Sequence, residues 1–259
     1  MLEQGALSGL KVVELTDRVS GQVAGSFCAR LLGDAGADVV KVEPPEGDAY
    51  RRNGPYPASV PDPDHSGLFL YLNSNKRGVR LDIESPEGRA AFSDLVSAAD
   101  FLVLGQDSSE VERLGLRREQ LAVADSGLIV TTITPFGLAG PNSVYLGDDL
   151  IAISAGGMAF ATPGIPDRVG DLASEPPLRS NTHMAGYLAG VQGAMASLAA
   201  LLSRTIQGTG CEIDLSMQEA VAAVMPFELA HASYHEAKPR KPEIFGVMPN
   251  AYLPCKDGY

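Results

Sequence analysis

Short apolar segments alternate with helical stretches between residues 11 and 134, and this alternation limits the possible folds more than any other feature. KVVELT (Lys11 to Thr16) and ADVVKVE (Ala37 to Glu43) both have the composition of strands. The stretch between them carries a helix ending near Gly33, which fits a right-handed βαβ unit. Further strands are expected at GVRLDI, FLVLG and GLIVTTIT. The alternation predicts an α/β fold built on an open sheet.

Between Arg179 and Arg204 the sequence SNTHMAGYLAGVQGAMASLAALLS contains no Asp, Glu, Lys or Arg. A bilayer-spanning helix usually carries more Leu, Ile, Val and Phe than this stretch of Ala, Gly, Ser and Met. We therefore predict a buried helix of a soluble core, roughly from residue 183 to residue 202, and no membrane association. Small residues recur every four positions at Gly186, Gly190 and Ala194, so another backbone can approach that face closely.

The composition argues against a nucleic-acid partner and indicates a cytoplasmic location. A formal net charge of −12 opposes binding to a phosphate backbone, so a nucleic-acid partner is not expected. Cys28, Cys211 and Cys255 lie far apart without a CxxC pair, which favours a reducing, cytoplasmic environment. The N-terminal MLEQGALSGLKVV lacks a basic region followed by an apolar one, so no secretory signal is expected there.

The pattern changes after residue 134. Residues 135–180 are rich in Gly, Pro and Asp, and CEIDLSM (Cys211 to Met217) is one more expected strand, followed by a helix interrupted near Pro226. The final NAYLPCKDGY resembles a hairpin that loses its second arm. We therefore expect this chain to be the N-terminal part of a longer polypeptide.

Several common catalytic motifs are missing from the sequence. No GxGxxG follows the first strand, and neither GxxxxGK[ST] nor GxSxG occurs. His231 and His235 are four residues apart, but Ala232 stands where a metalloprotease needs Glu, so no metal site is predicted. The adjacent Asp148 and Asp149 point to different faces of any regular element, so a helix start or a solvated loop is favoured over a catalytic dyad.

The run LNSNKRG is the most informative polar segment. Asn73, Ser74, Asn75, Lys76 and Arg77 concentrate amide dipoles and two positive charges in an acidic chain. Such a run is either a polar turn before a strand or a contact for a phosphate-bearing ligand.

Several segments together resemble CoA-transferase family III, the CaiB/BaiF group. The resemblance covers essentially the whole chain, and its segments, in the family's order, are LSGLKVVELT, LLGDAGADVVKVEPPEGD, NSNKRGVRLDIESPEGR, VERLGL, GDDLIAISAGGM, LAALLSRTIQGTGCEIDLSMQEAV and PCKDGY. It implies a Rossmann-like large domain, a smaller second domain and a dimer of two interlocked chains. On this basis residues 1–205 belong to the large domain, residues 206–225 form a strand and connecting helix, and residues 226–259 begin a truncated small domain.

The resemblance also implies a ligand, coenzyme A, and a set of residues that bind it. We refer to these residues as the predicted CoA cradle: Arg18, Val19, Ser20, Asn73, Ser74, Asn75, Lys76, Arg77 and Arg113. The backbone of residues 18–20 and the charges of the Lys and Arg side chains suit adenine, ribose and phosphate contacts. The other substrate implied is a carboxylic acid, and no metal is implied.

The sequence departs from the family at the position of the nucleophile. Active members use an Asp carboxylate that attacks the acyl-CoA thioester and forms a mixed anhydride. The gap-free match of the helix places Gly186 at that position, and aligning Asp171 there instead would break the match. The racemase branch has GHD where this chain has GDD, with Asp148 at the His position, and Gly105 stands where the family more often has Asn.

Three hypotheses follow from these departures. The chain belongs to a CoA-transferase whose Asp is supplied by a fused second unit or a partner subunit, and it is inactive alone; this is the hypothesis we favour. Alternatively it is a non-catalytic CoA-binding or assembly module. The third hypothesis is unconventional acyl-CoA chemistry, such as a racemase-like or isomerase-like activity, with Asp148 or His183 as substitute catalytic residues. The expected assembly is a homodimer or an association with a second CoA-transferase unit.

Overall fold

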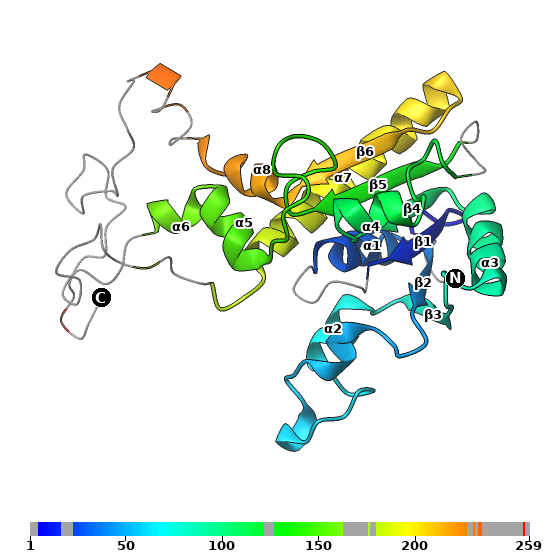
Figure 1. Ribbon diagram of the computed structural model, residues 1–259, viewed down its shortest axis with the longest axis horizontal. Coiled ribbons are helices and arrows are strands. Elements are labelled where there is room, and N and C mark those ends of the chain that lie inside the picture. Colours follow the sequence, from blue (N-terminus) through cyan, green and yellow to red (C-terminus); the bar gives the residue numbers. More distant parts are fainter. Residues whose placement is uncertain are drawn as a thin grey trace.

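A computed structural model describes most of the chain as far as residue 226 (Figure 1). The described residues are 5–16, 23–121, 127–162, 176, 180–226, 230, 233–234 and 256. Residues 18–20 of the predicted CoA cradle, Asp171, His231 and His235 lie outside them, as does most of the predicted small domain.

A six-stranded, all-parallel sheet forms the centre of the structure, which confirms the predicted α/β fold. The strands are β1 (Lys11–Leu15), β2 (Asp38–Glu43), β3 (Lys76–Arg80), β4 (Phe101–Leu104), β5 (Ile129–Thr134) and β6 (Glu212–Ser216). Their order is β3-β2-β1-β4-β5-β6, so the direction of winding reverses between β1 and β4. In open sheets of this kind ligands bind outside the carboxyl ends of the strands near such a switch point.

One strand differs in position from the sequence prediction. The strand expected at residues 78–83 runs over Lys76–Arg80 instead, because its ladder with β2 pairs Val39 with Lys76 and Glu43 with Arg80. The strand expected at Cys211 to Met217 is confirmed as β6, which pairs with β5 along its whole length.

Helices cover both faces of the sheet (Figure 1). One face carries α1 (Ala24–Asp34) and α7 (Met184–Gln207), and the other carries α3 (Pro86–Ser97) and α4 (Ser108–Arg113). The remaining helices are α2 (Gly67–Leu72), α5 (Asp149–Ala155), α6 (Met158–Ala161) and α8 (Met217–Ala222), and the connection from β2 to β3 also holds the short 3₁₀ turns η1 (Ala49–Arg52) and η2 (Pro57–Ser59). Alternate residues of β1 serve the two faces: Val12 packs with α1 and α7, whereas Val13 packs under α3 and α4.

The connection from β5 to β6 has the opposite hand to the connection from β1 to β2. The two connections step in opposite directions along the sheet, yet their helices α7 and α1 cover the same face. If both connections were right-handed, two connections that run in opposite directions along the sheet would have their helices on opposite faces. Because of this exception the first turns of α1 and α7 lie next to each other at the carboxyl edge of the sheet.

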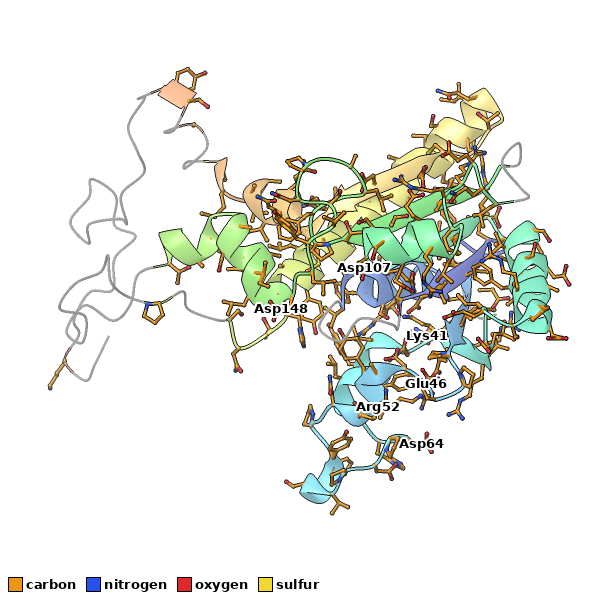
Figure 2. All side chains as sticks on the ribbon, in the orientation of Figure 1. Lys41, Glu46, Arg52, Asp64, Asp107 and Asp148 are labelled. Atoms are coloured by element: carbon orange, nitrogen blue, oxygen red, sulfur yellow. The ribbon has the colours of Figure 1, made fainter. Side chains whose placement is uncertain are left out.

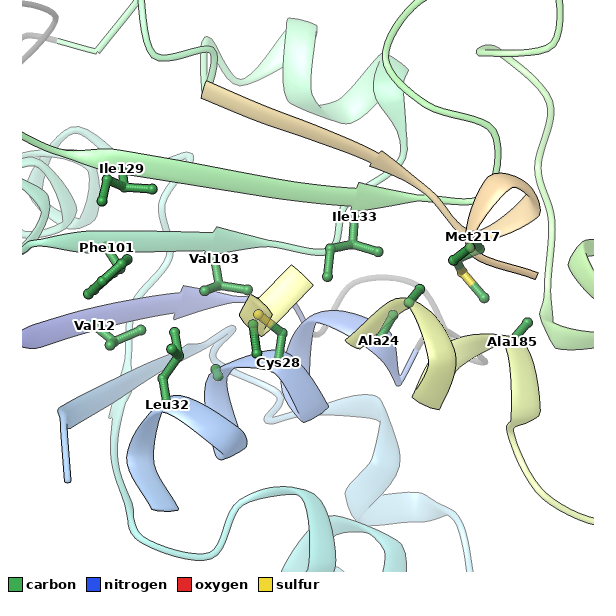
Figure 3. Packing of buried hydrophobic residues seen from close by; sticks show 14 of the residues in the cluster. Val12, Ala24, Cys28, Leu32, Phe101, Val103, Ile129, Ile133, Ala185 and Met217 are labelled. Atoms are coloured by element: carbon green, nitrogen blue, oxygen red, sulfur yellow. The ribbon is translucent and has the colours of Figure 1, made fainter. Parts of the chain in front are cut away.

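The packing of α7 against α1 follows from its small residues (Figure 3). A Cβ atom on Gly190 would lie 2.8 Å from the carbonyl oxygen of Ala24, so no larger residue allows this approach. Figure 3 shows Ala185 of α7 and Ala24 of α1 in the same apolar cluster as Ile133 of β5. The predicted burial holds for one face of α7, since Met195, Leu202 and Ile206 on its outer face are exposed.

By length and composition alone, α7 passes the test for a membrane-spanning helix. Of the most apolar window within it, 44% is buried inside the structure. The core helix of a soluble protein passes the same test, and the close contact with α1 is the arrangement that such a core helix requires.

Candidate functional site

The first turns of α1 and α7 meet at Gly186. A Cβ atom on Gly186 would lie 2.5 Å from Cγ2 of Val23, the fully buried residue that precedes α1. Real Cβ atoms essentially never come so close to another heavy atom, and the stiff, branched Val23 side chain has little freedom to move away. The position that the resemblance assigns to a nucleophile therefore has no room for a side chain in this structure.

A carboxylate nevertheless lies beside Gly186. Asp149, at the start of α5, is 3% exposed, and its Oδ1 accepts the backbone N–H of Gly186 at 3.1 Å. Its Oδ2 is buried without a hydrogen-bond partner among the described residues. Burial raises the pKa of the Asp149 carboxyl group, an effect that hydrogen bonds from the first turn of α7 and the nearby His183 only partly offset.

The two substitute catalytic residues proposed from the sequence have separate surroundings. Asp148 is the N-cap of α5, and its Oδ1 accepts the N–H of Ile151 at 3.0 Å, as the helix-start interpretation of the GDD run predicts. His183 precedes α7 and makes no side-chain capping bond. Its ring lies edge-on to the rings of Tyr50 and Tyr187, with centroids 6.4 Å away in each case. Asp148 thus has a local structural role, and His183 lies within an aromatic cluster.

Lys76 of the predicted CoA cradle is buried in an ion cluster beneath α1. Its Nζ lies 2.6 Å from Oε2 of Glu14 and donates to the carbonyl oxygen of Ser26 at 2.8 Å. The other oxygen of Glu14 accepts from Lys41 Nζ at 2.8 Å, and Lys41 Nζ also lies 2.8 Å from Oδ2 of Asp48. We call Glu14, Lys41, Asp48 and Lys76 the buried ion cluster; their side chains are at most 2% exposed.

The titration of the buried ion cluster reflects two opposed effects. Burial by itself raises the pKa of the Glu14 carboxyl, but Lys41 and Lys76 outweigh it and lower this pKa to about 2. Burial also lowers the pKa of the Lys76 ammonium to about 8, with Glu14 opposing that change. The charge of Lys76 is therefore matched inside the protein and is not presented to a ligand in this structure.

Asn73, Ser74 and Asn75 form the turn between α2 and β3, and Arg77 lies within β3. Asn73 Nδ2 donates to the carbonyl oxygen of Phe69, and Ser74 Oγ donates to that of Leu70, so both cap the end of α2. Asn75 has a positive φ of 61° and donates to Asp34, and Arg77 pairs with Asp38. In sequence this run could be a polar turn or a phosphate contact. The structure shows Asn73, Ser74 and Asn75 making the contacts of a turn, and Arg77 making an ion pair with the neighbouring strand.

Arg113 lies apart from that turn, in a cleft at the carboxyl ends of β2 and β4. The cleft has a volume of about 570 Å³. Figure 2 labels three of its lining residues, Glu46, Arg52 and Asp107. Arg77 lines a different hollow of about 470 Å³ on the sheet face beside α3. The described members of the predicted CoA cradle therefore do not converge on one site.

Two contacts of this region could not be found from the sequence. Nothing in the sequence marks Val23 as the residue that fills the space at Gly186, because their contact depends on how two distant helices pack. Asp149 stands out in sequence only as the neighbour of Asp148, and its burial depends on how α5 packs against α7. Among the described residues, no group of three or more His, Cys, Asp or Glu side chains could hold a metal ion.

Comparison with known proteins matches this chain to other proteins along nearly its whole length. The family model described as CoA-transferase family III matches residues 7–259. Two curated relatives are each 32% identical over 97% of the chain: the succinyl-CoA:(R)-benzylsuccinate CoA-transferase subunit BbsE of Thauera aromatica and the (R)-2-hydroxy-4-methylpentanoate CoA-transferase of Clostridioides difficile. The chain spans 58% and 60% of the lengths of these relatives.

Solved structures give the same result. A CaiB/BaiF family protein from Brucella suis superimposes with a TM-score of 0.82 and 30% identity, covering 99% of this chain and 65% of that protein. The hypothetical protein Rv3272 from Mycobacterium tuberculosis superimposes with a TM-score of 0.74 and 26% identity, covering 90% of this chain and 61% of that chain. The chain belongs to CoA-transferase family III.

Proposed function

We propose that this chain is one unit of a CoA-transferase and that a partner chain supplies the attacking carboxylate. In the reaction of the family, a carboxylate oxygen attacks the thioester carbonyl, the carbon–sulfur bond breaks, and CoA leaves as its thiolate. The CoA thiolate then attacks the enzyme's own carbonyl carbon in the mixed anhydride, which releases the donor acid as its carboxylate and leaves an enzyme–CoA thioester. A second carboxylate attacks that thioester, and the thiolate that leaves attacks the acyl carbonyl of the new anhydride, which gives the product thioester and restores the enzyme carboxylate. This chain would contribute its sheet and helix starts to the assembly while the partner's carboxylate carries the acyl group.

The contact between Val23 and residue 186 carries this proposal. An Asp at residue 186 would need the space that a Val23 methyl group fills, since its Cβ would lie 2.5 Å from that carbon. It would also stand next to the buried carboxylate of Asp149, which already accepts the backbone N–H of residue 186. Both the packing and the charge at this point suit Gly and oppose a second carboxylate.

The names of two relatives agree with a division of labour between chains. The relative from Thauera aromatica is named as a subunit, and a relative from Chloroflexus aurantiacus, 32% identical over 97% of this chain, is named as the beta subunit of succinyl-CoA–L-malate CoA-transferase. CoA-transferases of this family thus include enzymes with distinct subunits. We propose the same organisation here, with a family III chain that carries the Asp as the partner.

The racemase-like alternative has less support. It requires the residue at the His position of the GHD run to exchange a proton with substrate, and here that residue is Asp148, whose carboxylate caps α5. A non-catalytic assembly module is the second candidate, and the excess of carboxylates in the cleft around Arg113 favours it.

Locating the acyl group tests the proposal. The chain would be purified from its own cells together with its bound partner, incubated with a panel of acyl-CoA thioesters, and quenched with hydroxylamine. Mass spectrometry of the peptides then reads the resulting hydroxamate. We expect it on an Asp of the partner and on no residue of this chain. A hydroxamate on a carboxylate of this chain, Asp149 included, would refute the proposal.

A further inference from the structure

The cleft around Arg113 lies where an open α/β sheet binds its ligand. It adjoins the carboxyl ends of β2 and β4, next to the switch point between β1 and β4. Its lining residues are Pro44, Pro45, Glu46, Gly47, Ala49, Arg52, Asp82, Glu84, Asp107, Glu110 and Arg113. These residues include five carboxylates and two guanidinium groups, so the cleft bears net negative charge.

Two of these carboxylates accept from four of the five N–H groups of the Arg113 guanidinium. Its Nη1 and Nη2 donate to the two oxygens of Glu84 at 2.9 and 3.2 Å. Its Nε and Nη2 donate to the two oxygens of Glu110, both at 2.8 Å. A phosphate that binds Arg113 through two parallel hydrogen bonds must therefore displace a carboxylate, which already uses that geometry.

The rest of the lining gives a phosphate little compensation. Arg52 donates to the carbonyl oxygen of Glu46 at 3.4 Å, and the Glu46 carboxylate lines the same cleft. Asp107 already accepts the backbone N–H of Glu110 at 3.0 Å as the N-cap of α4, which competes with any anion for the start of that helix. Like charges in a cleft reinforce one another and repel an anionic ligand before it makes contact.

We infer that this cleft excludes the nucleotide end of CoA, so that the described residues lining it do not hold CoA through its phosphates. The inference rests on the proposed function, in which a partner chain carries the acyl group, and it adds that the same partner also binds the CoA diphosphate and 3′-phosphate. Glu84 and Glu110 are the residues that set this specificity, because they convert Arg113 from a phosphate ligand into one member of an internal ion network.

Removing two charges in the cleft tests the inference. In Glu84→Gln/Glu110→Gln, Arg113 keeps hydrogen-bonding partners but loses both ion pairs. The two glutamates are about half and a quarter exposed, so the fold should tolerate the change. The control is Glu87→Gln/Glu112→Gln, which removes two charges from α3 and α4 without altering the lining. Calorimetry measures the affinity of the full chain for CoA and for its uncharged fragment pantetheine.

The wild-type chain should bind CoA no more tightly than pantetheine. The Glu84→Gln/Glu110→Gln variant should bind CoA at least about tenfold more tightly than wild type, with pantetheine unchanged, and the control should match wild type. Added salt should weaken the binding gained by the variant, because screening reduces its attraction to phosphate.

Two results would overturn the inference. The first is that the wild-type chain binds CoA more tightly than pantetheine, with an affinity that falls as salt is added. The second is that the Glu84→Gln/Glu110→Gln variant gains no affinity for CoA. Neither result depends on where the acyl group is trapped. An Asp of the partner could still carry the acyl group while this chain binds CoA, so a failure here is distinguishable from a failure of the proposed function.

Discussion

The buried ion cluster and the cleft around Arg113 each contain a positively charged side chain, but the two side chains lie in opposite surroundings. Lys76 lies in the interior, where Glu14 matches its charge at 2.6 Å. Arg113 lies at the surface, where Glu84 and Glu110 together outnumber its charge. In the sequence both residues look like available positive charge. Neither side chain offers its charge to a phosphate. Lys76 is buried and paired with Glu14, whereas Arg113 is exposed and paired with two carboxylates.

The largest effect is expected at the centre of the buried ion cluster. Glu14→Gln keeps the shape of the side chain but leaves Lys76 and Lys41 without their shared carboxylate. Breaking a buried pair in this way leaves an uncompensated charge, so we expect a loss of about 3–5 kcal/mol in the free energy of unfolding. Urea denaturation at neutral pH measures it. A loss no larger than that of a surface substitution would mean that the cluster contributes little to stability.

Acid titration of the same variant shows whether the charge of Glu14 is the cause. The pKa of Glu14 is about 2 in the folded chain and ordinarily 4.5, so its contribution is complete above pH 4.5 and is lost as pH falls from 4.5 toward 2. The difference in unfolding free energy between wild type and Glu14→Gln should therefore shrink across that window. A difference that stays constant with pH would point to packing rather than charge.

The smallest effect is expected in the cleft. Arg113→Ala removes an exposed side chain whose partners both face solvent. Ion pairs of this kind contribute little to stability and are screened by salt. The midpoint of urea denaturation should not change measurably. A clear drop in the midpoint would show that the Arg113 network supports the fold and would remove the contrast with the buried ion cluster.

Periodicity and local signals predicted much of the fold. The alternation of strands and helices predicted the sheet, and the uncharged stretch predicted a helix. The uncharged stretch predicted α7 to within a few residues at its start, although the helix continues to Gln207, beyond the end of the apolar run. These features depend on neighbours in the sequence and are therefore readable from it.

The site was less predictable because its decisive contacts join distant residues. The match to family segments identified Gly186 as the position of interest, but only the packing of α7 on α1 brings Val23 to it. Lys76 could be read as a surface residue until the sheet placed Glu14 two strands away within reach of it. Which charges are available to a ligand is a property of the assembled sheet rather than of a segment.

A double-mutant cycle tests most directly whether the structure leaves no room for a side chain at residue 186. The variants are Gly186→Ala, Val23→Ala and their combination, with unfolding free energies from urea denaturation. Gly190→Ala serves as the control, because its Cβ would meet Ala24 and Phe27 rather than Val23. A methyl group forced into filled space costs about 1–3 kcal/mol, whereas Ala in an unobstructed helix is slightly favourable.

We predict that Gly186→Ala destabilises the wild-type chain and is neutral or stabilising once Val23 is Ala, a coupling of at least about 1 kcal/mol. Val23→Ala should give no such relief to Gly190→Ala. An equal effect of Gly186→Ala in both backgrounds would contradict the claim, because it would show that Val23 does not fill the place where an attacking carboxylate would begin.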